Sequence, residues 1–199
     1  MGLHDKWSLA VRLAAAFAYL LLHAGHSVGL LVFSETLDLH YPAARGREHF
    51  QRLLGVLRRC QPRVEGGASI PESCLKALPR QTAVLLLSDL LRPDGMLSML
   101  DRLLLTGRPL HVLRIYSCRD CRPAATGRVL LRDVETGARI AVTLQESTLL
   151  AAQSALDGWS GKIRDYCRNR GLPYTPCPVS SGWETCLVQH LRRLEADHA

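Results

Sequence analysis

Three short apolar runs constrain what this chain can fold into more than any other feature of its sequence. The runs cover residues 28–33, 83–87 and 110–116. Strands that are buried on both faces have this pattern, whereas strands with one face in water alternate apolar and polar residues. Helical spacing of apolar residues occurs at 6–23, 49–60, 71–78 and 95–105. This alternation of helices and buried strands predicts an α/β fold, with 28–33 as a parallel central strand.

Beyond residue 116 the pattern changes to that of a hairpin. Two β-rich stretches, 127–131 and 138–143, are separated by the turn-forming segment Asp133-Val134-Glu135-Thr136-Gly137. Such a segment between short apolar stretches is typical of a β-hairpin. We therefore expect an antiparallel hairpin at the edge of the sheet.

The C-terminal third combines two helices with a proline-rich strand. Apolar spacing predicts a helix over 149–170, which we expect to be interrupted near Gly158 and Gly161. Three prolines in the stretch 173–178 allow only an edge strand there, because proline cannot donate to a ladder on both sides. A final amphipathic helix is predicted over 185–195.

Composition and charge match an ordinary globular protein. Of the 199 residues 47% are hydrophobic and 22% are charged, which excludes collagen-like and disordered classes. The net charge is +7, and 22 of the 25 basic residues are arginine. These arginines are dispersed, with few aromatic residues among them, so we interpret them as solvated or paired with carboxylates. Nucleic-acid binding through the dispersed arginines stays an alternative.

The apolar runs and the cysteines indicate a cytoplasmic protein. The longest apolar run, 13–22, is well below the roughly 20 residues that a membrane span needs. No Ala-x-Ala cleavage site follows it, which argues against a signal peptide. The seven cysteines do not form the dense framework of a small secreted domain. We expect no membrane span and a reducing compartment.

Several short segments together resemble a known family. They include 6–16 with Gly25, Phe33-Ser34, Arg45-Gly46-Arg47, Gly66-Gly67, Leu86-Leu87-Ser88-Asp89 and 133–137. In this order the segments resemble a bacterial von Willebrand factor A-like family, the domain-of-unknown-function family fifty-eight, often encoded beside MoxR-type AAA+ ATPases. The resemblance covers nearly the whole chain. It implies one domain over 1–199, with a largely parallel, Rossmann-like sheet of von Willebrand A type, an antiparallel hairpin edge and helices on both faces.

Two departures from the family pattern concern its metal-ion-dependent adhesion site. The first metal loop, Asp-x-Ser-x-Ser, is missing, and Ala68 stands where the family has Thr, leaving only the hydroxyl of Ser69 beside it. Asp89 matches the third ligand and is the residual metal candidate. Because Mg²⁺ demands near-octahedral oxygen coordination, we expect this degenerate site to hold no metal tightly and the chain to use no cofactor. Asp89 is then a loop or helix-cap residue.

The strand that precedes the first long helix in this family is also missing. We therefore expect an N-terminally truncated domain, in which an upstream extension of the reading frame or a neighbouring chain supplies that strand. In its absence the strands at 28–33 and 83–87 either pair directly or leave backbone groups without partners.

The resemblance implies a non-catalytic protein-interaction adaptor that works with a MoxR-type AAA+ ATPase. Open α/β sheets place ligands at the carboxyl ends of their strands. The expected partner loops are those around Ser34, Ser69 and Asp89. The sequence has no phosphate loop, Gly-x-Gly-x-x-Gly fingerprint or His-Glu-x-x-His motif, so we do not expect an enzyme.

Thiol chemistry is a further alternative. Cys118 and Cys121 have the two-residue gap of zinc knuckles and dithiol redox centres, although no second pair with this gap exists. This alternative is a redox or metal-binding protein that uses these two thiols. Cys186 and His190 lie one helical turn apart, as a nucleophile and its base would. We expect Cys186 in the core and His190 on the surface.

Overall fold

The computed structural model describes residues 2–62, 70–91, 93–117, 127–132 and 139–197. In chain order its elements are α1 (Gly2–His23), β1 (Val28–Phe33), β2 (Leu37–Ala44), α2 (Arg47–Arg59), α3 (Glu72–Ala77), β3 (Val84–Ser88), α4 (Pro93–Leu104), β4 (Leu110–Tyr116), β5 (Gly127–Arg132), β6 (Arg139–Leu144), α5 (Glu146–Asn169), β7 (Tyr174–Pro178), a 3-10 turn (Val179–Ser181) and α6 (Gly182–Asp197). The predicted α/β class, with a parallel sheet and an antiparallel hairpin, is confirmed.

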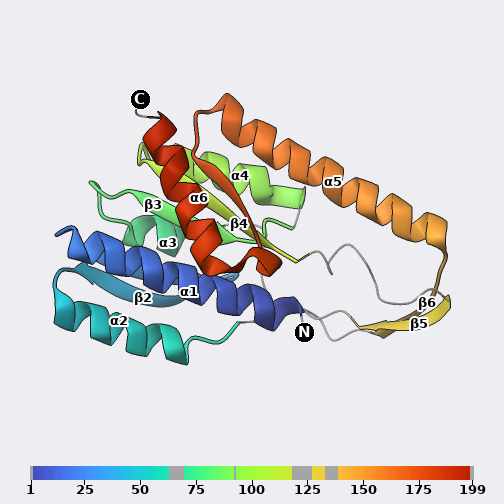
Figure 1. Ribbon diagram of the computed structural model, residues 1–199, viewed down its shortest axis with the longest axis horizontal. Coiled ribbons are helices and arrows are strands. Elements are labelled where there is room, and N and C mark those ends of the chain that lie inside the picture. Colours follow the sequence, from blue (N-terminus) through green and yellow to red (C-terminus); the bar gives the residue numbers. More distant parts are fainter. Residues whose placement is uncertain (1, 63–69, 92, 118–126, 133–138, 198–199) are drawn as a thin grey trace.

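A parallel three-stranded sheet forms the centre of the fold, with the order β3-β4-β7 (Figure 1). Val84 pairs with Leu110, and Val112 pairs with Tyr174. The proline-rich strand β7 lies at an edge, as the sequence predicts, because Pro176 and Pro178 are tolerated where only one side of the strand is paired.

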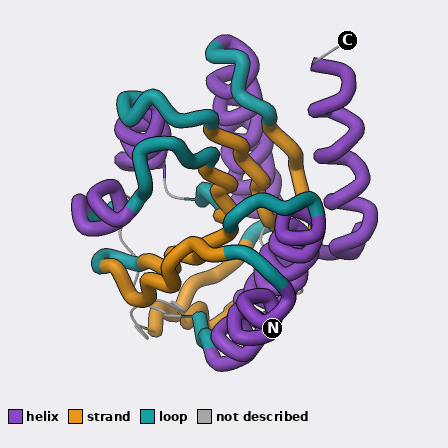
Figure 2. The backbone as a smooth tube through the Cα atoms, turned by 90° about the vertical axis from the view of Figure 1, so that its left-hand side faces the viewer, coloured by secondary structure: helices purple, strands orange, loops and turns teal. Residues whose placement is uncertain are grey.

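Helices cover both faces of this sheet (Figures 1 and 2). On one face Leu86 and Val112 pack in a cluster with residues of α3, α4 and α5. On the other face Leu113 and Ile115 pack in a second cluster with residues of α1 and α6. Neighbouring residues of a strand point to opposite faces, so an uninterrupted apolar run serves two cores at once. The predicted double-sided burial is confirmed.

Strand β1 departs from its expected place. It is antiparallel to β2, with Leu31 opposite His40, and the two strands form a sheet of their own. The expectation of a parallel central strand is wrong, because the turn between β1 and β2 is only three residues long. Ser34 donates its backbone N–H to the carbonyl of Thr36, 3.0 Å away, and turns the chain straight back. A parallel neighbour requires a much longer crossover.

Strands β1 and β3 do not pair with each other. In the part of the chain that the structure describes, β1 is bonded to β2 only and β3 to β4 only. Of the two outcomes expected for strands 28–33 and 83–87, direct pairing is therefore wrong. Both strands nevertheless contribute to the same core, because Leu31 and Phe33 pack against the cluster that contains Leu86.

Two further expectations need correction. The hairpin of β5 and β6 is antiparallel as predicted, but it is a separate two-stranded sheet rather than an edge of the parallel sheet. Helix α5 is continuous through Gly158 and Gly161. A glycine inside a helix costs only about 1 kcal/mol relative to alanine, which the packing of Ile163 and Cys167 in the core easily offsets.

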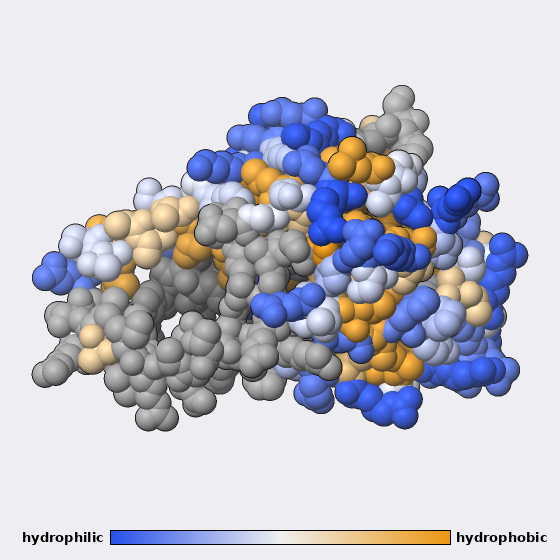
Figure 3. Space-filling view, turned by 180° about the vertical axis from the view of Figure 1, so that it is seen from behind, coloured by the Kyte–Doolittle hydropathy of each residue, from blue (hydrophilic) through white to orange (hydrophobic). Residues whose placement is uncertain are grey.

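The surface seen from behind is mixed in character. Hydrophilic residues are spread widely over it, with apolar residues between them (Figure 3). Within the described ranges four arginines pair with carboxylates, namely Arg52, Arg102, Arg168 and Arg170. No helix of the described residues is long and apolar enough to cross a membrane.

Candidate functional site

The candidate site is the loop that follows β3, at the carboxyl edge of the parallel sheet. Two short side-chain contacts shape this loop. The hydroxyl of Ser88 accepts the backbone N–H of Leu90 at 3.2 Å, and Oδ1 of Asp89 accepts that of Leu91 at 3.4 Å. Leu90 is fully buried with a φ of 51°, a left-handed conformation that is uncommon for a residue other than glycine. The surrounding structure therefore holds the loop in a strained conformation.

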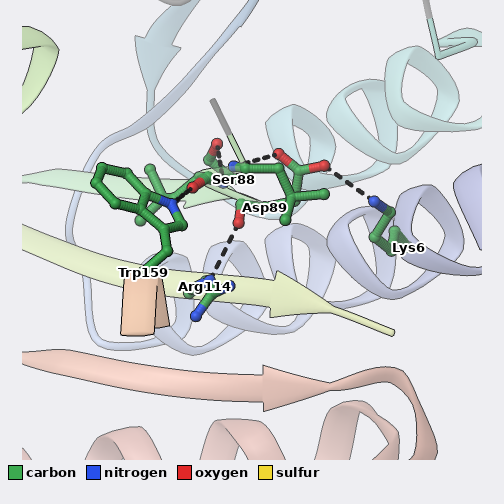
Figure 4. A network of polar contacts seen from close by, with 7 residues as sticks. Lys6, Ser88, Asp89, Arg114 and Trp159 are labelled. Atoms are coloured by element: carbon green, nitrogen blue, oxygen red, sulfur yellow. Dashed lines mark hydrogen bonds and ion pairs between the residues drawn. The ribbon is translucent and has the colours of Figure 1, made fainter. Parts of the chain in front are cut away.

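Two side chains from other elements hold the carbonyls of this loop (Figure 4). The indole N–H of Trp159, on α5, donates to the carbonyl of Leu90 at 2.6 Å. Nε of Arg114, on β4, donates to the carbonyl of Asp89 at 3.2 Å. These contacts supply partners for backbone groups that leave the sheet at the end of β3. Trp159 is partly buried and also packs against the hydrophobic cluster on this face of the sheet.

The carboxylate of Asp89 is occupied by an ammonium group. Nζ of Lys6, in the first turns of α1, lies 3.0 Å from Oδ2 of Asp89 (Figure 4). The Lys6 side chain is 12% exposed and that of Asp89 is 37% exposed, so the pair lies partly below the surface. Asp89 is thus a loop residue, not the cap of α4. Asp89 is the carboxylate that the sequence analysis gives as the residual metal candidate, and the positive charge of Lys6 already pairs with it.

Of the other two predicted site residues, the structure describes only Ser34. Ser34 lies half-buried in the turn between β1 and β2, and in the described part of the chain it forms no hydrogen bond with Asp89. Ser69 lies outside the described residues, as do Cys118 and Cys121. The structure therefore places Ser34 and Asp89 each at the end of a strand, and a single cluster of the three residues stays a prediction.

Residues that the sequence analysis missed complete this site. Lys6, Arg114 and Trp159 come from three separate elements. The sequence did contain an indication that Arg114 is unusual. It is a charged residue inside an apolar run, 110–116, that the pattern predicts to be buried. It is indeed only 4% exposed. Nothing in the local sequence indicates that Lys6 reaches Asp89, 83 residues further along the chain.

Four of the five described thiols lie in the core, and Cys60 is partly exposed. Cys74, Cys167, Cys177 and Cys186 are fully buried. Burial raises the pKa of Cys167 to about 11, against the opposing effect of the nearby Arg170 guanidinium, and burial also raises the pKa of Cys177. A thiol with a raised pKa is a poor nucleophile at neutral pH. Among the described residues no group of three or more His, Cys, Asp or Glu side chains could hold a metal ion.

His190 is buried, and the expectation that it lies on the surface is wrong. It is 1% exposed, while Cys186 is in the core as predicted. Nδ1 of His190 lies 2.9 Å from Oγ1 of Thr175, and Nε2 lies 3.2 Å from Nδ1 of His111. Burial, with a smaller effect of His111, lowers the pKa of His190 to about 4. A neutral imidazole with both nitrogens bonded is a structural group here, facing β4 and β7 rather than Cys186.

Comparison with known proteins identifies the family. No curated protein and no solved structure matches the chain. A family model described as "Protein of unknown function DUF58" matches residues 2–155. This match covers the helix that carries Lys6, the loop that carries Asp89, and strand β4 with Arg114. The chain therefore belongs to the DUF58 family, as the resemblance of its sequence predicts.

Proposed function

We propose that this chain is a non-catalytic protein-interaction adaptor that works with a MoxR-type AAA+ ATPase. The observation that carries the proposal is the ion pair between Lys6 and Asp89. An ammonium at this carboxylate neutralises the charge that would otherwise attract a cation, so the loop keeps its shape without a metal. Such a loop is suited to present a fixed surface to a protein partner. The identity of the partner comes from the resemblance to the family.

The proposed docking surface lies at the carboxyl ends of the strands, around Ser34 and Asp89. Loops at this edge are where open α/β sheets usually bind their ligands. The loop after β3 is held from two sides by Arg114 and Trp159. A pre-organised loop loses little conformational entropy when a partner binds, which favours affinity.

Binding to the MoxR-type ATPase of the same organism tests the proposal. The purified chain is immobilised and the ATPase is passed over it without nucleotide, with ADP and with a non-hydrolysable ATP analogue. We expect saturable binding in at least one of these states. Ser34→Arg places a long cationic side chain in the proposed surface and should weaken binding at least about tenfold, the loss typical of one disrupted central contact.

The matched control is Leu105→Arg. Leu105 is 86% exposed and follows α4 at the opposite end of the sheet, near the start of β4. The same side chain is thus introduced far from the proposed surface, and binding should not change. Absence of binding in every nucleotide state contradicts the adaptor proposal. Equal loss in both variants contradicts the assignment of the surface.

A further inference from the structure

Arg114 is a buried cation that no carboxylate of the described residues pairs with. It lies on β4 and is only 4% exposed, yet in the described part of the chain no carboxylate lies within ion-pair distance of its guanidinium. Its Nε donates to the carbonyl of Asp89, and its guanidinium also donates to the hydroxyl of Tyr174. An arginine carries five N–H donors in a planar fork, and a buried charge is stable only when paired and hydrogen-bonded.

The neighbours of Arg114 are polar and aromatic but contribute no negative charge to it. Its guanidinium carbon lies 5.4 Å from the centre of the Tyr116 ring. The phenol of Tyr174, on β7, lies on the same face: burial raises its pKa, and the Arg114 guanidinium beside it opposes that rise. Neither ring supplies a carboxylate, so among the described residues no acidic side chain pairs with the charge of the arginine.

The labelled side chains of Figure 4 carry one more positive charge than negative charges. Lys6 and Arg114 are positive, and Asp89 is the one negative side chain among the labelled residues. Asp89 offers its carboxylate to Lys6 and only its backbone carbonyl to Arg114. Among the described residues, the network therefore lacks a negative charge beside the guanidinium.

We propose that Arg114 anchors an oxyanion-binding site at the carboxyl edge of the parallel sheet, and that the ligand bears a phosphate or carboxylate group. The guanidinium fork matches two oxygens of such a group with parallel hydrogen bonds. The hydroxyl oxygen of Tyr174 accepts a hydrogen bond from Arg114, so its own O–H is the group that it can donate to such a ligand. The site goes beyond the proposed function and does not rest on it.

Titration calorimetry with inorganic phosphate and with acetate, at constant ionic strength balanced by chloride, tests the proposal. We expect saturable one-site binding of at least one of these anions. Tighter binding of phosphate assigns a phosphate-bearing ligand, and tighter binding of acetate assigns a carboxylate. Arg114→Met should abolish the binding. Arg52→Met is the matched control, because it removes a cation whose side chain is 64% exposed and should leave binding unchanged.

A second variant keeps the test decisive if Arg114→Met does not fold. Asp89→Asn removes the negative charge of the network while it keeps the shape of the side chain. Loss of this repulsive charge should tighten anion binding about three- to tenfold, as expected for a unit charge several ångströms away at a protein surface. Unchanged or weaker binding in Asp89→Asn overturns the proposal. The absence of saturable binding of either anion to the unmodified chain also overturns it.

Discussion

Nζ of Lys6 lies 3.0 Å from Oδ2 of Asp89 and joins the first turns of α1 to the loop after β3. This ion pair gives the metal prediction a physical basis, because a divalent cation at Asp89 would have to displace the ammonium. We expect the chain to bind Mg²⁺ or Mn²⁺ no more tightly than millimolar, and titration calorimetry measures this. A micromolar site that Asp89→Ala removes would contradict the prediction and restore a metal-dependent adhesion mechanism.

Stability should fall in mild acid because of His190. Its pKa is lowered to about 4 in the folded chain, whereas the unfolded value is the ordinary 6.5. The neutral form is favoured by folding, so this stabilisation is complete above pH 6.5 and is lost as the pH falls toward 4. Between pH 7 and pH 5 we expect a loss of about 2 kcal/mol in the free energy of unfolding.

Urea unfolding at a series of pH values measures this loss. His190→Gln should flatten the pH dependence over this range. The control is His26→Gln, since His26 is exposed and its replacement should leave the slope unchanged. An equal slope in the unmodified chain and His190→Gln would show that another group causes the acid sensitivity.

Gly29 should not tolerate a side chain. A Cβ at this position would lie 2.9 Å from the backbone N of Ala43 and the carbonyl O of Tyr41, at a bulge between β1 and β2. Backbone atoms cannot rotate away, so Gly29→Ala should destabilise the chain by about 1–3 kcal/mol. Gly55→Ala is the matched control: nothing lies within 4 Å of its Cβ in α2, and we expect a gain of about 0.5–1 kcal/mol. Urea midpoints that do not separate the two variants would contradict this.

Thiol labelling should follow burial. Cys60 is partly exposed, whereas Cys167 is fully buried and has a pKa raised to about 11 by that burial. Iodoacetamide should therefore modify Cys60 at least about tenfold faster than Cys167, because the thiolate is the reacting form. Mass spectrometry of the labelled peptides gives both rates. The difference should disappear in urea, and a native Cys167 that reacts as fast as Cys60 would show that this side of the core opens readily.

The edge of β3 that no strand of the described residues covers should be visible in hydrogen exchange and in self-association. The backbone N–H of Val84 donates to Pro109, on the β4 side, so those of Leu85 and Leu87 point to the other edge. We expect faster amide exchange at Leu85 and Leu87 than at Leu86. Unpaired apolar edges also favour association, so residues 1–199 should form oligomers or aggregates as concentration rises. A monomer with a sharp melt above about 55 °C, in the usual mesophile range, would contradict this.

The local pattern of residues was sufficient for most elements. Helix α1, strands β3 and β4, the edge strand β7 and the hairpin of β5 and β6 follow from periodicity and turn chemistry. These signals act over a few residues, so they are present in the sequence itself. Strand β2 was missed because Pro42 and the polar residues Asp38 and His40 interrupt its apolar positions.

Which strands became neighbours was decided by the tertiary structure. The run 28–33 is apolar enough for a central parallel strand, yet it pairs with β2 and not with β3. An apolar run indicates that the side chains of a strand are buried. It does not indicate which other strand pairs with each edge, because the backbone hydrogen-bonding groups are nearly the same in every residue.

In the candidate site, too, local sequence determined some features and the tertiary structure decided the others. The sequence by itself determined that Asp89 follows a buried strand. Only the tertiary structure decided that Lys6 pairs with Asp89 and that, among the described residues, no carboxylate pairs with the buried Arg114 beside it. Contacts between residues 83 and 25 positions apart depend on how helices pack on the sheet, and no local pattern encodes that packing.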